Sequence, residues 1–268
     1  MANNICCPEC ASTEIAPYFS EGEIDFLRCN QCSLVWRNPI PDISELAAIY
    51  IEAYATDNVV SGNTDQESGG YATEQYAAYL LENVLKKSDS ILDYGAATGE
   101  LVEKLRTLGF SAEGYEFSDD ARDYCRQKRN IELFNTPSDI PKARYRVITL
   151  IEVIEHLRQP GQTLRELAEC LVAGGQLFIT TPSRNGWRAR VEGGRWREAR
   201  KKFHLYLFDE TCIRYLLLNS GFNNIRRIRF SPITRPGLAR WLWGRVMQMV
   251  GLGGTLCITA ERGKQEAV

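Results

Sequence analysis

The stretch Ile91-Leu-Asp-Tyr-Gly-Ala-Ala-Thr-Gly-Glu100 decides the fold of this chain. A short apolar run ends at Asp93, two glycines bracket small residues, and apolar residues then recur at helical spacing (Leu101, Val102, Leu105 and Leu108). This order predicts a strand, a tight turn and a helix, which form the first unit of a doubly wound α/β sheet. In such a sheet the ligand lies at the carboxyl ends of the strands.

The spacing of the two glycines separates two classes of ligand. A dinucleotide turn follows the pattern G-x-G-x-x-G, which places a pyrophosphate on the N-terminus of the helix. Here Gly95 and Gly99 are separated by three residues, and Asp93 precedes them at the strand end. An acid at that point would repel a phosphate and attract an ammonium group. The turn therefore disfavours a nicotinamide dinucleotide.

Further along the chain, elements resemble those of the class I S-adenosylmethionine (SAM)-dependent methyltransferases, in the same order. After the glycine turn come Tyr115-Glu116-Phe117 at the end of a second strand, the strand 147–151 followed by Glu152-Val-Ile-Glu-His-Leu157, and the segment 171–182, expected as a helix end, a glycine turn and a strand. The resemblance covers residues 86–261 and implies a mostly parallel, seven-stranded Rossmann-like sheet. Where the family usually has Phe-Asp, this chain has Tyr145-Arg146.

The resemblance also implies SAM as the cofactor and a set of residues around it. Glu116 takes the position of the acid that binds the ribose hydroxyls. Tyr71 opens a helical stretch over 71–85 that would lie over the pocket, with a packed aromatic as the alternative. The residues expected to bind the cofactor are Tyr71, Asp93, Gly95, Ala97, Gly99, Glu116, Phe117 and Ile151.

Nine cysteines, no apolar run of membrane-spanning length and no secretory signal predict a reducing, cytoplasmic location. Cys7-Pro-Glu-Cys10 and Cys29-Asn-Gln-Cys32 form two C-x-x-C pairs with eighteen residues between them. Each pair offers two thiolates to one tetrahedral ion, so the spacing predicts a structural zinc site. A redox dithiol or an iron site is the alternative.

The chain therefore divides into a zinc ribbon over 1–38, a helical linker over 39–85 and a methyltransferase domain over 86–268. A basic insertion at 183–205 interrupts the last of these. From Arg184 to Arg245 there are fifteen Lys and Arg against four Asp and Glu, whereas residues 1–183 have fifteen against twenty-eight. Clustered positive charge attracts anions, which favours an anionic acceptor. An amphoteric surface with no partner is the alternative.

Only two histidines occur, and one of them belongs to the Glu152-x-x-Glu155-His156 stretch. Positions i, i+3 and i+4 share one face of a helical turn, and His204 could return to the same place after the insertion. Two carboxylates and two imidazoles suit magnesium, manganese or zinc. The set is similar to that of the ubiquinone-biosynthesis O-methyltransferases and the small-RNA 2′-O-methyltransferases, which implies a catalytic metal. A histidine base without metal, and a purely structural role, remain open.

Near the C-terminus, apolar residues mark one helical face over 238–250. Packing against the core or the pocket is expected for this face, with a membrane-surface helix as the alternative.

The leading hypothesis is O-methylation of a small anionic or sugar-derived acceptor, because the cysteine pairs and His204-Leu-Tyr-Leu-Phe208 resemble bacterial methyltransferases of glycan synthesis. An RNA methyltransferase is the first alternative, although the cysteine segment is acidic. A catalytically silent zinc-ribbon adaptor is the second.

Overall fold

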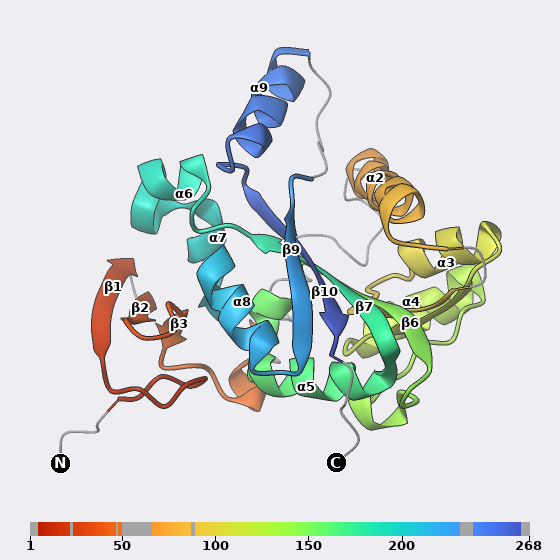
Figure 1. Cartoon of the computed structure of the whole chain (residues 1–268), viewed down its shortest axis with the longest axis horizontal. Coiled ribbons are helices and arrows are strands. Elements are labelled where there is room, and N and C mark those ends of the chain that lie inside the picture. Colours follow the sequence, from red (N-terminus) through yellow and green to blue (C-terminus); the bar gives the residue numbers. More distant parts are fainter. Residues whose placement is uncertain are drawn as a thin grey trace.

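The computed structural model describes residues 5–21, 24–46, 48–49, 66–86, 89–230 and 238–263 (Figure 1). Among these, the side chains of Glu21, Ile24, 66–71 and 238–241 are not described. Tyr71 therefore lies in a helix, but its predicted contact with the cofactor falls outside the described side chains.

The chain folds around a six-stranded sheet with the order β5-β4-β6-β7-β10-β9. Neighbouring strands are parallel from β5 to β7, and β10 runs antiparallel to both of its neighbours. The predicted fold class, a mostly parallel α/β sheet, is confirmed. The strands are β4 (Ser90–Tyr94), β5 (Ser111–Tyr115), β6 (Tyr145–Ile151), β7 (Leu171–Pro182), β9 (Phe222–Ile228) and β10 (Thr255–Arg262).

The prediction of seven strands is wrong by one for the residues described. The position beyond β5 holds a single parallel bridge between Tyr115 and Phe134. Phe134 N donates to Gly114 O (2.8 Å), and Glu116 N donates to Phe134 O (3.2 Å). A 3-10 turn, η1 (Pro137–Asp139), begins three residues later, and its proline has no N–H to extend a ladder.

Helices cover both faces of the sheet, because alternate residues of each strand point to opposite sides. In β4, Ile91 belongs to the cluster that packs against α2 and α3, whereas Leu92 belongs to the cluster that packs against α5 and α8. Both side chains are fully buried. The covering helices are α2 (Gln66–Asn83), α3 (Glu100–Thr107), α4 (Asp119–Arg129), α5 (Pro160–Cys170) and α8 (Glu210–Leu218).

A second sheet, of order β1-β2-β3-β8, joins the N-terminal segment to the rest of the chain. We call residues 5–38 the cysteine module. Its last strand β3 pairs antiparallel with β8, so that Val35 lies opposite Leu207 and Trp36 opposite Tyr206. Arg37 adds two hydrogen bonds, from its N to Leu205 O (2.8 Å) and from its Nη1 to Lys202 O (2.6 Å). The strands are β1 (Ile15–Glu21), β2 (Ile24–Cys29), β3 (Val35–Asn38) and β8 (Tyr206–Leu207).

The basic insertion is folded as short helices between β7 and β8. These are α6 (Trp187–Glu192), η3 (Gly193–Arg195) and α7 (Arg197–Arg200). The last helix, α9 (Leu238–Met249), stands away from the layered body in Figure 1. None of the helices in the described ranges is both long and apolar enough to cross a membrane.

Three local predictions differ from the structure. The helix expected over 71–85 begins earlier, at Gln66. The segment 171–182 is strand from its first residue and not a helix end followed by a turn. The glycine turn is replaced by a register shift in the pairing with β6, between Tyr145 and Val147, at which Gly174 (φ 67°) bulges out of the ladder. The apolar face of α9, expected to pack on the core, is exposed.

Candidate functional site

The glycine turn after β4 forms the floor of the candidate cofactor site. Gly95 (φ 87°), Ala97 (φ 47°) and Gly99 (φ 76°) all adopt the left-handed region. Gly95 N and Ala96 N both donate to Tyr115 O, at 2.8 and 2.9 Å, which ties the turn to the end of β5. The predicted strand, turn and helix are therefore present, and the turn lies at the carboxyl ends of two parallel strands.

Both glycines of the turn are required by space as well as by φ. A Cβ at Gly99 would lie 2.4 Å from Cys125 Sγ, and one at Gly95 would lie 2.4 Å from Val153 Cγ2. Real Cβ atoms do not approach other heavy atoms this closely, so a side chain at either position would displace α4 or the loop after β6. The packing behind the turn thus explains why both positions are glycine.

Asp93 is a buried acid at the last but one position of β4, two residues before Gly95. Its Oδ1 accepts a hydrogen bond from Thr149 Oγ1 (2.6 Å), and its side chain is almost inaccessible. Burial raises the pKa of Asp93 to about 6, opposed by the bond from Thr149 and supported by the negative charge of Glu116. A positively charged group bound here would relieve the cost of burying this carboxylate.

Glu116 places a second carboxylate against the turn. Its Oε2 accepts from Ala97 N and its Oε1 from Ser118 N, both at 2.9 Å. Asp93, Gly95, Ala97, Gly99 and Glu116 are therefore brought together. Two carboxylates beside an open backbone turn fit the cationic and hydroxyl groups of SAM, and they fit a diphosphate poorly.

Two further residues predicted to bind the cofactor, Phe117 and Ile151, make no described hydrogen bond with the glycine turn. Phe117 is 62% exposed, so its ring is not enclosed by the protein. Ile151 is half-buried at the end of β6 and packs with the cluster that contains residues of α2 and α3. Their cofactor contacts remain predictions.

The glutamate and histidine cluster lies after β6, in the turn η2 (Ile154–His156). Ligand atoms of Glu155, His156 and His204 all lie within 4.8 Å of one another. Glu155 Oε1 is 3.7 Å from His156 Nε2, and the two imidazole centroids are 4.8 Å apart. Glu152 does not belong to this group: it has a left-handed backbone (φ 55°) and precedes the turn. The structure thus brings three of the four predicted residues together.

Hydrogen bonds fix the orientation of His156 and Glu155. His156 Nδ1 lies 3.0 Å from Phe203 O, which can only accept, so Nδ1 carries the proton and Nε2 presents a lone pair toward Glu155. Glu155 Oε2 accepts from Thr181 Oγ1 (2.9 Å), and Glu155 O accepts from Leu205 N (2.9 Å). The turn is therefore clamped between the end of β7 and the segment that contains His204.

Burial holds the two imidazoles of this cluster neutral near pH 7 and leaves the cluster incompletely hydrogen-bonded. Among the described residues, Glu152 Oε1, Glu155 Oε1 and His204 Nδ1 are buried without a hydrogen-bond partner. Burial raises the pKa of Glu155 to about 7 and, together with the charge of Glu155, that of Glu152 to about 8. Burial also lowers the pKa of His156 to about 4 and holds that of His204 well below its usual value. Neutral imidazoles can accept a proton or bind a metal.

Sequence reasoning missed Thr180 and Thr181, which lie at the carboxyl end of β7. Thr180 Oγ1 accepts from Glu152 N (3.2 Å) and lies 3.5 Å from the Tyr76 hydroxyl. Thr181 holds Glu155. The sequence signal that could have identified them is a pair of polar residues at the end of an otherwise apolar strand.

The four predicted cysteine ligands converge in the cysteine module. The Sγ atoms of Cys7, Cys10, Cys29 and Cys32 lie within 4.8 Å of one another, with two pairs at 3.5 Å. A tetrahedral zinc ion with bonds of about 2.3 Å would place sulfurs about 3.8 Å apart, so the group fits one ion. The hydrogen bond between Cys7 and Cys32 lowers the pKa of Cys7 and raises that of Cys32, so Cys7 is the thiol of this pair that ionises first.

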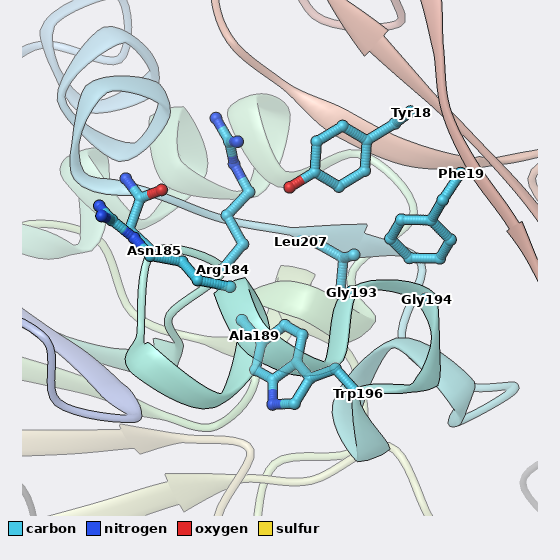
Figure 2. Close-up of a pocket in the computed structure, with 10 residues that line it drawn as sticks. Tyr18, Phe19, Arg184, Asn185, Ala189, Gly193, Gly194, Trp196 and Leu207 are labelled. Carbon is cyan, nitrogen blue, oxygen red and sulfur yellow. The ribbon is translucent and has the colours of Figure 1, made fainter.

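A pocket of about 280 Å³ lies between the cysteine module and the basic insertion (Figure 2). Tyr18 and Phe19 of β1 face Ala189 and Trp196 across it. Arg184 forms its buried end: the guanidinium pairs with the Asp209 carboxylate and lies 5.7 Å from the centre of the Tyr18 ring, while its Nε has no partner in the described part of the chain. Sequence reasoning placed the insertion at the acceptor side, but it did not identify Tyr18 and Phe19 as lining residues.

Comparisons with known proteins agree with this geometry. Residues 69–227 match the methyltransferase domain family. The ubiquinone biosynthesis O-methyltransferase of Coxiella burnetii (strain RSA 493 / Nine Mile phase I) is 27% identical over 119 residues, which are 40% of this chain and 49% of that protein. The corresponding protein of Shewanella pealeana is 30% identical over 111 residues, 38% and 47% of the two chains. The chain thus spans about half the length of the curated relatives it matches.

Solved structures share the fold. A putative methyltransferase complexed with the Haloferax volcanii Trm112 methyltransferase activator is similar with a TM-score of 0.59 and 17% identity, covering 79% of this chain and 97% of that one. Magnesium protoporphyrin IX methyltransferase from Synechocystis PCC 6803 with bound SAM gives 0.56 and 15%, covering 84% and 100%. By its family match, the chain belongs to the methyltransferase domain family, and its sheet and glycine turn share the fold of these solved methyltransferases.

Proposed function

We propose that the chain methylates an oxygen of a small anionic or sugar-derived acceptor. The observation that carries this proposal is the buried cluster of Glu155, His156 and His204, in which Glu155 Oε1 and His204 Nδ1 have no hydrogen-bond partner among the described residues. An oxygen acceptor must lose a proton, and neutral buried imidazoles can take it. The curated relatives are named as O-methyltransferases, which supports the same acceptor atom.

When bound, SAM supplies an activated methyl group, so the protein contributes alignment and proton removal. In our proposal, Gly95, Ala97 and Gly99 leave the backbone open to the cofactor. Asp93 balances its positive charge. Glu116 exchanges its bonds to Ala97 N and Ser118 N for ribose hydroxyls. Tyr71, Phe117 and Ile151 complete the predicted set.

For proton removal we propose His204 as the base. Its Nδ1 is buried without a hydrogen-bond partner in the described structure, and Glu198 Oε2 lies 3.9 Å away, where it would stabilise the imidazolium. Glu155 and His156 position the acceptor hydroxyl beside it. Glu155, His156 and His204 would also hold a divalent cation, whose chemistry is to lower the pKa of a bound hydroxyl. In that case Glu152 would not be a ligand of the cation.

The pocket of Figure 2 supports an anionic, ring-bearing acceptor. Arg190 supplies positive charge, Arg184 supplies the unpartnered Nε of a guanidinium that is already paired with Asp209, Asn185 supplies an amide, and Trp196 supplies an aromatic ring. Arg190 lines the pocket and is exposed, and its side chain makes no hydrogen bond or ion pair with the described residues. Arginine beside aromatic rings is the combination that binds phosphorylated sugars and nucleotides.

We further propose that residues 1–38 form a zinc ribbon, with zinc bound by Cys7, Cys10, Cys29 and Cys32 in a structural role. Residues 39–85 would be the linker over the cofactor, and 86–268 the methyltransferase domain with its insertion at 183–205. The pairing of β3 with β8 supports a bracing role for the ribbon, because β8 begins two residues after His204. The acidic residues Glu9, Glu14 and Asp25 of this module disfavour RNA as acceptor.

The test measures release of demethylated SAM with a panel of phenols, sugar phosphates and nucleotide sugars. We expect turnover with one anionic class, and a loss of about 100-fold for His204→Ala and Glu155→Gln, in the range expected for a general base. The matched control is Glu169→Gln on the exposed side of α5, which should retain full turnover. Calorimetry should show that all three variants bind demethylated SAM with the affinity of the original chain. Full turnover by His204→Ala would refute the proposed base.

A further inference from the structure

An apolar stripe runs along the outer face of α9. Leu242, Trp243, Val246 and Met249, with Val250 just beyond the helix, are between 47% and 66% exposed. At 100° per residue these positions fall within an arc of about 120°. Single exposed apolar residues are ordinary, but a contiguous set on one helix face marks a binding surface.

The C-terminal end of α9 is tied to the body of the protein. Leu252 N donates to Met247 O (2.7 Å), and Trp187 N of the insertion donates to Leu252 O (3.1 Å). Arg227 Nη2 of β9 donates to Gly251 O (2.7 Å). The helix is thus anchored at its C-terminal end, while Figure 1 shows it projecting from the layered domain. Its apolar face is therefore presented outward by an anchored helix.

The stripe continues onto the basic insertion. Trp187 and Trp243 meet edge to face, with ring centroids 6.1 Å apart. Val191 lies one turn after Trp187 on α6 and is 74% exposed, which is the largest exposure among the apolar side chains described. We define the apolar stripe as these residues of α6 and α9: Val191, Leu242, Trp243, Val246, Met249 and Val250.

Arginines border this stripe on the insertion side. Arg188 lies over the Trp187 ring at 5.4 Å, and Arg190, Arg195, Arg197 and Arg200 are all exposed on α6, η3 and α7. The same helices contain only two acids, Glu192 and Glu198. Glu198 is held by Lys201 and Arg197, so the outer surface of the insertion is positive.

We propose that the apolar stripe and the basic insertion bind together to an anionic lipid surface. Tryptophan and aliphatic side chains on one helix face enter the boundary between headgroups and acyl chains, and nearby arginines attract anionic headgroups. Tryptophan suits this boundary because its ring is apolar and its N–H is polar. This binding is independent of methyl transfer, and it would deliver the enzyme to acceptors held at a membrane.

A second copy of this chain fits the surface less well. A twofold dimer places the same patch of both copies face to face. The two arginine-rich insertions would then approach each other, and like charges at an interface are unfavourable. An anionic bilayer satisfies both the apolar and the charged part of the surface.

The proposal is tested by co-sedimentation of the whole chain with vesicles. One set contains phosphatidylcholine alone, and the other contains equal parts of phosphatidylcholine and phosphatidylglycerol. We expect retention on the anionic vesicles only, weakened when the salt is raised from about 0.15 M to about 1 M. Val246→Glu should reduce retention by about tenfold or more, because it places a charge in the apolar face that would enter the lipid. Arg195→Glu should also reduce it.

Matched controls separate the surface from general effects. Leu218→Glu changes a residue of α8 that is 63% exposed, and Lys128→Glu reverses an exposed charge on α4. Both should sediment like the original chain, and every variant should keep its melting temperature. Two results would overturn the proposal: no retention on anionic vesicles, or a concentration-dependent dimer in light scattering that Val246→Glu abolishes. Binding of demethylated SAM, measured in parallel, reports on the proposed methyl transfer separately.

Discussion

Trp36 of β3 and Tyr206 of β8 are register partners in one antiparallel ladder, although 170 positions separate them in the sequence. Both rings are buried, and the Tyr206 hydroxyl donates to Arg158 O (2.8 Å) in the loop after η2. The cysteine module therefore supports the strand that immediately follows His204. Unfolding of the cysteine module should therefore disturb the glutamate and histidine cluster.

The first prediction concerns metal removal. A module of this size has little core of its own, so zinc binding would provide much of its folding energy. We expect Cys32→Ser, or treatment with a strong chelator, to lower the melting temperature and to reduce turnover together. Zinc content by mass spectrometry and a thermal unfolding curve check this.

Cys6→Ser is the matched control, because Cys6 is exposed and lies outside the four-cysteine group. It should leave zinc content and melting temperature unchanged. A Cys32→Ser protein that retained one zinc per chain and full stability would show that the cysteines do not form the proposed site.

The second prediction concerns the glycine turn. Gly99→Ala places a Cβ against Cys125 Sγ in a left-handed backbone, so we expect a loss of about 2 kcal/mol in the free energy of unfolding and a weaker affinity for demethylated SAM. Denaturant titration and calorimetry measure the two effects. The double variant Gly99→Ala/Cys125→Ala removes the clash but keeps the φ penalty, so it should recover part of the stability. Equal loss in both variants would mean that the contact with Cys125 is not responsible.

The third prediction concerns Asp93 and pH. The pKa of Asp93 is raised from 3.8 to about 6 by burial, so the folded chain takes up a proton as the pH falls through 6. Its cost to stability is therefore present at neutral pH and disappears between about pH 6 and pH 4. This rise corresponds to at most about 3 kcal/mol. We expect Asp93→Asn to stabilise the ligand-free protein at neutral pH, and less so at pH 4, while weakening the binding of SAM.

Unfolding free energies of both proteins across this pH range provide the measurement. Thr149→Val is the companion variant, since it removes the hydrogen bond that favours the charged carboxylate. It should destabilise at neutral pH more than at pH 4. An Asp93→Asn protein that is less stable than the original at every pH would contradict the assigned cost of burial.

The fourth prediction concerns Asp209, which both caps α8 and pairs with Arg184. Its Oδ1 accepts from Cys212 N (2.8 Å), and its Oδ2 meets the buried guanidinium. Asp209→Ala removes the cap and leaves a buried charge, so we expect a loss of about 3–5 kcal/mol in stability. Ser118→Ala, which removes only the cap of α4, should cost about 1 kcal/mol. Similar losses in the two variants would show that the buried pair contributes little.

The parts predicted from sequence are those fixed by neighbours along the chain. The turn from Asp93 to Gly99 follows from an apolar run, two glycines and a helical period, and the cysteine group follows from spacing alone. By contrast, β8 has two residues and no periodicity of its own, so its pairing with Trp36 had no local signal. Glu152 was placed with the ligands because a regular turn was assumed, but its left-handed backbone takes it out of that face.

Exposure of α9 could not be predicted for a different reason. Apolar residues at helical spacing show that one face is apolar, but they do not show whether the protein core or a lipid surface covers it. Leu242 and Val246 give the same pattern in either case. The pocket beside Arg184 likewise depends on β1, which reaches the insertion only through the tertiary fold.

The order of strands also has a consequence for synthesis on the ribosome. In the described sheet β9 is the edge strand and pairs with β10 alone, although β10 is translated after it. The strand at Phe222–Ile228 must therefore wait, unpaired, until residues 255–262 have left the exit tunnel and inserted beside β7. A nascent chain stalled before that point would leave β7 and β9 with strand edges that have no partner, and unpaired strand edges are prone to aggregate.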